Sequence, residues 1–247
     1  MRTLLFLPMI LALALTGSVG SAADSPKGPV LVELFTSQGC SSCPPADRLL
    51  TKLGKDPRVI PLAFHVDYWN YIGWNDPFSS KAWSQRQQGY ARAFQSNRIY
   101  TPQLVVAGRT HAVGSNEAEV RQQIAKALAA EPAGRVTVSA TPAPDGRLTV
   151  KAGAKLVRPA GGPLDLWVAI YETGLTTKVG AGENASHTLA NDYVVRRLEK
   201  ALTLPGPTDS AELVLGLDKR WNREHLGVAA FLQDPKTLAI QGAAVAR

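Results

Sequence analysis

The sequence has few sulfur-containing residues, and it contains no repeats and no low-complexity stretch. Its 247 residues include two Cys and two Met. Both methionines, Met1 and Met9, lie at the extreme N-terminus, so no Met-rich copper-binding tract follows them. With only one pair of cysteines, the chain also cannot build a zinc site from two such pairs.

Long apolar runs and clusters of positive charge are missing beyond the N-terminus. No segment after residue 23 approaches 18 consecutive apolar residues, so we expect no membrane span there. The net charge is +7, but Lys and Arg are spread along the chain without a run of five. We therefore expect a solvated basic surface and no nucleic-acid partner.

The N-terminus has the three parts of a secretory signal peptide. Arg2 supplies the positive charge, residues 4–15 are almost wholly apolar, and Ser21-Ala22-Ala23 forms a small-x-small cleavage site. The alternative is an uncleaved membrane anchor, for which the apolar stretch is short. We expect residues 1–23 to be removed and the mature protein to be periplasmic or secreted, without stable membrane insertion.

Residues 24–133 alternate between strand-like and helix-like patterns. An apolar strand over residues 30–35 precedes a helix that starts at Pro44, and a second strand follows over residues 59–66, where Pro61 favours an edge position. Residues 67–100 form an aromatic-rich insertion with a helix near 80–94, and the sequence leaves open whether it covers the thiols. A hairpin over 104–113 and a helix after Asn116 complete this part.

Residues 134–247 contain about seven short strand-like runs between Gly and Pro turns, which is typical of a β-sandwich. Gly182-Glu183-Asn184 and His187 form a polar loop, but nothing there has the spacing of a metal or nucleophile site. We interpret this part as a scaffold or a partner-binding module.

Cys40 and Cys43 are the residues whose position indicates chemistry. A disulfide between them closes a very short loop, so it restrains the unfolded chain little and a purely structural role is the weaker interpretation. At a strand-to-helix turn, the helix N-terminus stabilises a thiolate and lowers its pKa. We expect Cys40 to attack and Cys43 to resolve the mixed disulfide, with Ser41 and Ser42 as hydrogen-bond donors to sulfur.

Four segments carry a resemblance to known families: Val32 to Pro44 with its Cys-Ser-Ser-Cys, Thr101-Pro102-Gln103-Leu104-Val105-Val106, Gly114-Ser115-Asn116, and His65-Val66-Asp67-Tyr68-Trp69 with the Gly-Trp-Asn-Asp-Pro-Phe that follows. The first three resemble the active-site segment, the cis-proline strand and the glycine turn of thioredoxins and glutaredoxins. Together the segments resemble a secreted bacterial family catalogued as domain of unknown function 1223.

This resemblance implies an α/β thioredoxin-like domain with a helical insertion, followed by an all-β sandwich-like domain. It also implies a cis Thr101–Pro102 bond beside the cysteines, with Pro102 positioning an extended substrate. No substrate is assigned by the resemblance.

His65 and Glu33 are supporting candidates, each with more than one interpretation. His65 ends a strand, where it is a proton relay, a metal ligand with the two cysteines, or simply a hydrogen-bonded residue of the insertion. Glu33 lies within the first strand and is either a proton acceptor for Cys43 or an ion-pair partner.

Three functional hypotheses follow. We favour an exported thiol-disulfide oxidoreductase that needs no cofactor or metal and acts on a protein or small thiol or disulfide. The alternatives are a copper-binding protein that uses Cys40, Cys43 and His65, and a non-catalytic binding module with a permanent disulfide. A reduction potential distinguishes the first from the third.

Overall fold

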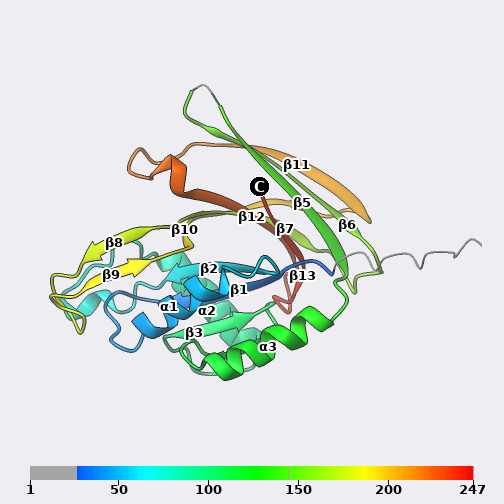
Figure 1. The fold of residues 1–247 in the computed structure, drawn as a ribbon. Helices are drawn as coiled ribbons and strands as arrows, with labels where there is room; N and C mark the ends of the chain where they lie inside the picture. The colour runs from blue at the N-terminus through cyan, green and yellow to red at the C-terminus, as the bar shows by residue number, and fades with distance from the viewer. Residues whose placement is uncertain (1–26, 144, 247) are drawn as a thin grey trace, which may run out of the picture.

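The structure, a computed structural model, describes residues 27–143 and 145–246 (Figure 1). The expected signal peptide, residues 1–23, lies outside the described residues. The chain up to residue 133 forms β1 (Val30–Thr36), α1 (Pro44–Leu53), β2 (Val59–His65), the 3₁₀ helix η1 (Asn70–Ile72), α2 (Lys81–Ala93), β3 (Gln103–Val106), β4 (Thr110–Val113) and α3 (Glu117–Ala129).

The rest of the described chain is almost entirely strand. It forms β5 (Gly134–Pro142), β6 (Leu148–Leu156), β7 (Asp165–Glu172), β8 (Leu175–Lys178), β9 (Thr188–Asn191), β10 (Val194–Thr203), β11 (Thr208–Leu215), the 3₁₀ helix η2 (Arg223–His225), β12 (Leu226–Gln233) and β13 (Ile240–Val245). None of the helices among the described residues is long and apolar enough to cross a membrane.

The expected fold class, an α/β thioredoxin-like domain followed by an all-β sandwich-like domain, is wrong. The described chain is mostly β, and its main element is one mixed eight-stranded sheet with the order β13-β12-β7-β10-β2-β1-β3-β4. Four strands of that sheet come from the chain after residue 133, so the sheet runs across the expected domain boundary. The pattern of most strands was readable locally, but strand pairing between distant segments was not.

The junction between the two parts of the sheet lies at β2. β1 and β2 are parallel along their whole length, whereas β10 pairs with β2 only at Val194 and Ala63. Pro61, which lacks an N–H donor, precedes this bridge, so β2 accepts a neighbour only beyond its proline. The expectation that Pro61 marks an edge strand is therefore wrong, although the proline limits the pairing.

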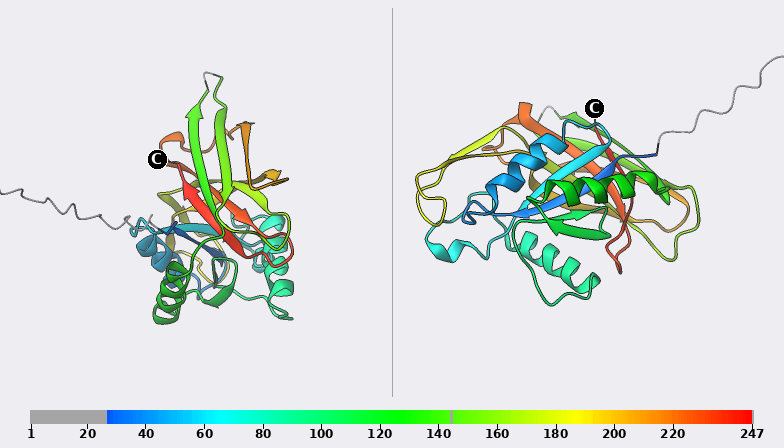
Figure 2. Two further views of the ribbon diagram at one scale, coloured as in Figure 1. Left: turned by 90° about the vertical axis from the view of Figure 1, so that its right-hand side faces the viewer. Right: turned by 60° about the horizontal axis from the view of Figure 1, so that its bottom comes forward.

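The faces of the large sheet are covered by different layers (Figure 2). α1 and α3 pack against the strands β1 to β4 through one apolar cluster, which includes Leu50 and Val120. On the same face, the three-stranded sheet β11-β6-β5 packs against β7 and β12. The opposite face carries α2, whose Trp83 and Tyr90 join a cluster that reaches Phe231 of β12. This cluster contains residues from both parts of the chain.

Strand alternation decides which residues meet α1. In β1, Val32 and Leu34 belong to the cluster under α1, whereas Leu31 and Phe35 belong to the cluster on the α2 face. Side chains two positions apart share a face. Thr36 therefore faces α1, whereas Glu33 faces α2.

Candidate functional site

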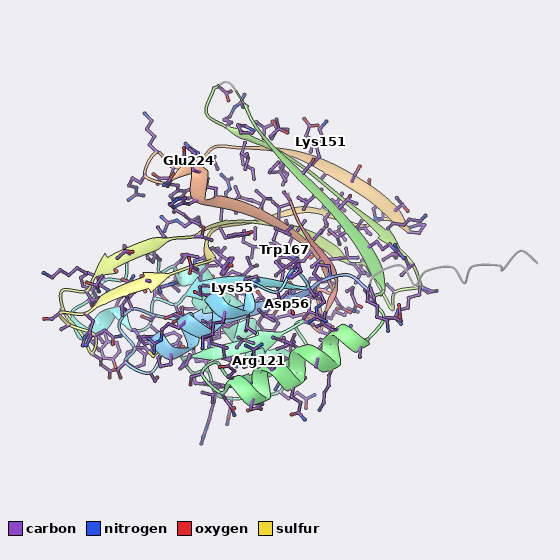
Figure 3. The ribbon with its side chains drawn as sticks, in the orientation of Figure 1. Lys55, Asp56, Arg121, Lys151, Trp167 and Glu224 are labelled. Carbon is purple, nitrogen blue, oxygen red and sulfur yellow. A yellow bond between two sulfur atoms is a disulfide. The ribbon has the colours of Figure 1, made fainter. Side chains whose placement is uncertain are left out.

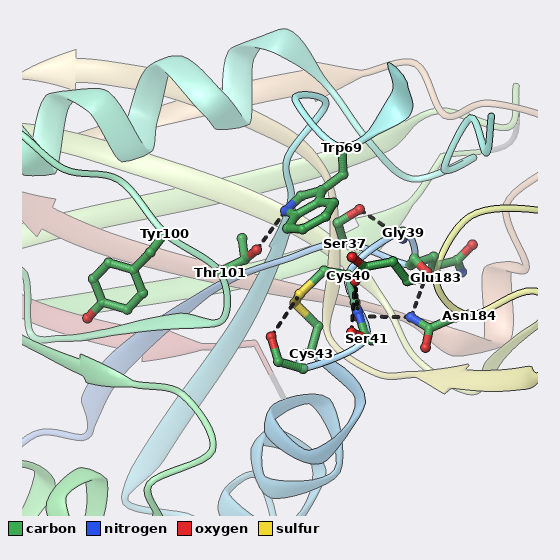
Figure 4. Close-up of a disulfide and its surroundings, with 12 residues drawn as sticks. Ser37, Gly39, Cys40, Ser41, Cys43, Trp69, Tyr100, Thr101, Glu183 and Asn184 are labelled. Carbon is green, nitrogen blue, oxygen red and sulfur yellow. Dashed lines mark hydrogen bonds between the residues drawn. A yellow bond between two sulfur atoms is a disulfide. The ribbon is translucent and has the colours of Figure 1, made fainter. Parts of the chain in front are cut away.

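The two cysteines form a disulfide at the start of α1 (Figure 4). Cys43 is the N-cap residue of this helix, and Pro44 and Pro45 occupy its first two positions. Prolines fit there because first-turn N–H groups have no partner within the helix. The amides of Ala46 and Asp47 bond the Cys43 carbonyl at 2.9 and 3.1 Å. The pair thus lies at the positive end of a helix dipole.

Both cysteines are buried in this disulfide form. Cys40 is 1% exposed and Cys43 is 0% exposed. The Sγ atom of Cys40 lies 3.3 Å from the Ser42 hydroxyl, as expected for one of the two serines. Ser41 points elsewhere, because its amide and its hydroxyl both donate to Glu183.

The loop that leads into β3 approaches the disulfide. The Thr101–Pro102 peptide bond is cis, which confirms that expectation. Trp69, in the aromatic segment of residues 68–74, donates its indole N–H to the Thr101 hydroxyl at 2.7 Å, and the indole lies beside the disulfide (Figure 4). Gly114 bonds the Pro102 carbonyl through its amide at 2.9 Å. The aromatic segment and the proline loop therefore cover the cysteines together.

His65 forms a buried pair with Asp76, a residue that the sequence analysis did not single out. Their Nδ1 and Oδ2 atoms are 2.7 Å apart, and both side chains are fully buried. Burial disfavours the imidazolium, but the Asp76 carboxylate outweighs burial and raises the pKa of His65. Conversely, the imidazolium overcomes burial and lowers the pKa of Asp76. The pair is therefore held in its charged form.

Asp47 is the second titratable residue that the sequence analysis missed. It is 8% exposed, and its carboxyl group lies near the Thr36 hydroxyl and the His65 imidazole. Burial raises the pKa of Asp47 to about 6, against the opposite effect of His65. Its position four residues after Cys43, on the buried side of an amphipathic helix, was the signal that could have identified it.

Thr36 and His65 are directly paired across β1 and β2, at the carboxyl ends of both strands. Since paired residues share a face, both point toward α1 and Asp47. Within the described chain, neither the Thr36 hydroxyl nor His65 Nε2 has a hydrogen-bond partner. Thr36, His65 and Asp47 thus form a buried polar group under the helix that begins at Cys43.

Glu33, by contrast, lies away from this group. Its carboxylate accepts a hydrogen bond from Arg86 Nε at 2.6 Å and another from the Tyr90 hydroxyl, on the α2 face of the sheet. Gln233 of β12 also donates to Tyr90, at 3.0 Å. Of the two interpretations of Glu33, the structure therefore favours the ion-pair partner.

The loop between β8 and β9, whose Asn184 follows Cys40 by 144 residues, also contributes to the site. Asn184 donates to the carbonyl groups of Gln38 and Cys40, both at 2.9 Å. Gln38 in turn donates its side-chain amide to Asn191 at 3.0 Å. The polar loop that showed no site spacing in the sequence therefore contacts the cysteine turn directly.

Across residues 27–143 and 145–246, no three His, Cys, Asp or Glu side chains gather as a metal site. His65 Nδ1 is already engaged by Asp76. The geometry therefore offers the copper hypothesis no ready set of ligands.

The fold and the site define a β-rich protein that carries a buried Cys-x-x-Cys disulfide at a helix N-terminus. The chain belongs to the family described as Protein of unknown function (DUF1223), whose model matches residues 31–233. No curated protein sequence matches the chain.

Two solved structures are similar to this one. A crystal structure of a protein from Agrobacterium tumefaciens is 30% identical, with a TM-score of 0.71 over 91% of this chain and 96% of that chain. HBP35 of Porphyromonas gingivalis is 17% identical, with a TM-score of 0.62 over 90% of this chain and 75% of that chain. The second likeness concerns the fold alone.

Proposed function

We propose that the protein is a thiol-disulfide oxidoreductase that works outside the cytoplasm through Cys40 and Cys43. The observation that carries the proposal is the position of the disulfide, at a helix N-terminus and one helical turn before Asp47, which is buried near His65 and Thr36. A helix N-terminus stabilises the thiolate that exchange requires. The signal-peptide pattern of residues 1–23 supports an oxidising compartment, where disulfides persist.

The reaction consists of two successive thiol-disulfide exchanges. In the oxidising direction, a substrate thiolate attacks Cys40 Sγ, the Cys40–Cys43 bond breaks, and Cys43 leaves as a thiolate that takes up a proton. The second thiolate of the substrate then attacks the substrate sulfur that is bonded to Cys40. This forms the substrate disulfide and releases Cys40 as a thiolate. The substrate dithiol loses two electrons, and the cysteine pair gains them. The reducing direction is the exact reverse, with Cys40 as the attacking thiolate and Cys43 as the resolving one.

Asp47 is suited to hold the proton that Cys43 gains or loses. Its pKa of about 6 allows it to change protonation near neutral pH, and it lies one helical turn after Cys43. His65 assists by keeping positive charge beside the Asp47 carboxyl group, with Asp76 fixing the imidazole through Nδ1. Thr101 and Pro102 lie next to the disulfide and provide the surface on which an extended substrate segment binds.

The test is the reduction potential of the pair in the purified mature protein, equilibrated in glutathione buffers with metals chelated. We expect a value in the range of known oxidoreductases, roughly −120 to −270 mV, and its place in that range gives the direction. A pair that stays oxidised below roughly −300 mV would contradict the proposal and favour a structural disulfide.

A trapping experiment tests the order of the two cysteines. Cys43→Ser should accumulate a mixed disulfide on Cys40 when the variant meets an oxidised peptide, because the resolving thiol is absent. Cys40→Ser is the matched control and should trap much less. Equal trapping by both variants, measured by intact mass, would contradict the assignment of Cys40 as the attacking residue.

A further inference from the structure

The loop between β8 and β9, residues 179–187, makes hydrogen bonds with the backbone of the cysteine turn. Asn184 donates to the carbonyls of Gln38 and Cys40, and the Glu183 carboxylate accepts from the Ser41 amide and hydroxyl at 2.9 and 2.8 Å (Figure 4). These bonds join residues more than 140 positions apart in the sequence. The loop thus occupies two acceptors and two donors of the turn that carries the disulfide.

The same loop also lies against the aromatic segment that covers the cysteines. A Cβ atom at Gly182 would lie 3.0 Å from Ile72 Cδ1 and 3.4 Å from Trp74 Cβ, and one at Gly180 would lie 3.2 Å from the Trp74 ring. Gly182 also has a positive φ of 77°, which glycine adopts without strain. Ile72 in turn approaches Gly39, the residue before Cys40. The 179–187 loop therefore contacts both the cysteine turn and the aromatic segment, and these two also contact each other.

The disulfide is buried beside Trp69, and the 179–187 loop holds both the cysteine turn and the aromatic segment in place around it (Figure 4). Attack on a disulfide needs a thiolate in contact with one sulfur atom, and the two cysteines are 1% and 0% exposed. Glu183, by contrast, lies at the surface. The hydrogen bonds from Ser41 hold the pKa of the Glu183 carboxyl below its ordinary value, so the loop is held by a charged acceptor at neutral pH.

We propose that the 179–187 loop is a gate, latched by Asn184 and Glu183, that selects polypeptide thiols over small alkyl thiols. The selection rests on the proposed exchange function. Lifting the loop leaves the Gln38 and Cys40 carbonyls and the Ser41 amide without partners, which costs free energy. An extended peptide backbone carries both N–H and C=O groups and replaces these bonds, whereas an alkyl thiol without amides replaces none.

The first test measures the rate at which excess dithiothreitol reduces the disulfide, with iodoacetamide quenching and mass analysis. Asn184→Asp keeps the shape of the side chain but replaces its N–H donors with carboxylate oxygens that face two carbonyls. We expect the rate to rise about thirtyfold, the factor that two ordinary hydrogen bonds give. Asn97→Asp, at an exposed position, is the matched control and should react like the wild type. An unchanged rate in a folded Asn184→Asp would overturn the gate.

Glu183→Gln provides a milder second variant in case Asn184→Asp destabilises the fold. It keeps an acceptor for Ser41 but removes the charge, so we expect a smaller rise in the dithiothreitol rate. Glu224→Gln, an exposed position in η2, is its control (Figure 3). A Glu183→Gln rate equal to that of the Glu224→Gln control would count against the latch.

The second test addresses selection. The wild-type disulfide should react faster with a five-residue peptide that contains one central cysteine than with 2-mercaptoethanol, after correction for thiol pKa, and Asn184→Asp should lose that preference. Equal rates in the wild type would overturn the proposed selection. These are rates with excess reductant, so they do not depend on the equilibrium potential. The two proposals can therefore fail separately. If dithiothreitol reduces Asn184→Asp faster than wild type but the reduction potential of the cysteine pair lies below roughly −300 mV, the exchange function is refuted and the closure by the loop is not.

Discussion

His65 Nδ1 and Asp76 Oδ2 meet at 2.7 Å, with both side chains withdrawn completely from solvent. Each group shifts the pKa of the other toward its charged form, since the pKa of His65 is raised and that of Asp76 is lowered. The stability from Asp76 is lost as pH falls through its native pKa, and the stability from His65 is lost as pH rises through its native pKa. The pair therefore stabilises the fold most between those two values.

Asp76→Asn should leave the His65 imidazolium buried without its counter-charge. We expect a loss of about 3 to 5 kcal/mol in the free energy of unfolding by urea, because a buried pair is broken from one side. The pKa of His65, followed by NMR, should fall. Asp145→Asn, which breaks an exposed pair with Arg147, should leave the free energy of unfolding almost unchanged. A cost at Asp76 as small as at Asp145 would contradict the buried pair.

Asp47→Asn should change how stability depends on pH. The native pKa of Asp47 is about 6 against an ordinary 3.8, so the native state binds the proton more tightly and stability falls as pH rises through this range. Removing the charge should therefore stabilise the variant relative to wild type by about 2 kcal/mol more at pH 7 than at pH 4. Urea unfolding at both values measures the difference.

The control for that experiment is again Asp145→Asn. Arg147 holds the pKa of Asp145 below its ordinary value, so its substitution should shift the pH dependence in the opposite direction. If Asp47→Asn gave the same difference at pH 4 and pH 7, the native carboxyl group would not have a raised pKa.

Glu33→Gln separates the two interpretations of Glu33. Because Arg86 would lose its buried partner, we expect a loss of about 3 to 5 kcal/mol in unfolding free energy. The reduction potential of Cys40 and Cys43 should stay at the wild-type value, since Glu33 lies on the α2 face of the sheet. A changed potential in the folded variant would restore Glu33 as a proton acceptor.

Gly114→Ala tests the close packing around Pro102. A Cβ atom there would lie 2.7 Å from Leu34 Cδ1 and 3.2 Å from Pro102 Cβ. We expect a loss of about 1 to 3 kcal/mol from overpacking, measured as a lower urea midpoint. Gly161→Ala, where a Cβ meets nothing within 4 Å, is the control and should be close to neutral. Equal midpoints for the two variants would show that the site accommodates a methyl group.

Local pattern was sufficient for the elements of the first half. The strand before the cysteines, the helix that starts at Pro44 and the hairpin around Gly108 lie where the sequence predicts them. These features depend on side-chain alternation, proline and turn chemistry within a few residues. β8 and β9 were missed, because each has four residues and a polar pattern without a strong period.

Local sequence therefore determined that a cysteine pair begins a helix after a buried strand, with a proline loop to follow. Only the tertiary structure decided that Glu33 faces away from that pair, that Asp47 and Asp76 both lie near His65, and that Asn184 bonds the backbone of the cysteine turn. It also decided that strands from both parts of the chain share one sheet. The reason is that these relationships depend on backbone pairing and buried charges between distant segments, whose partners are chosen by the packing of the whole chain.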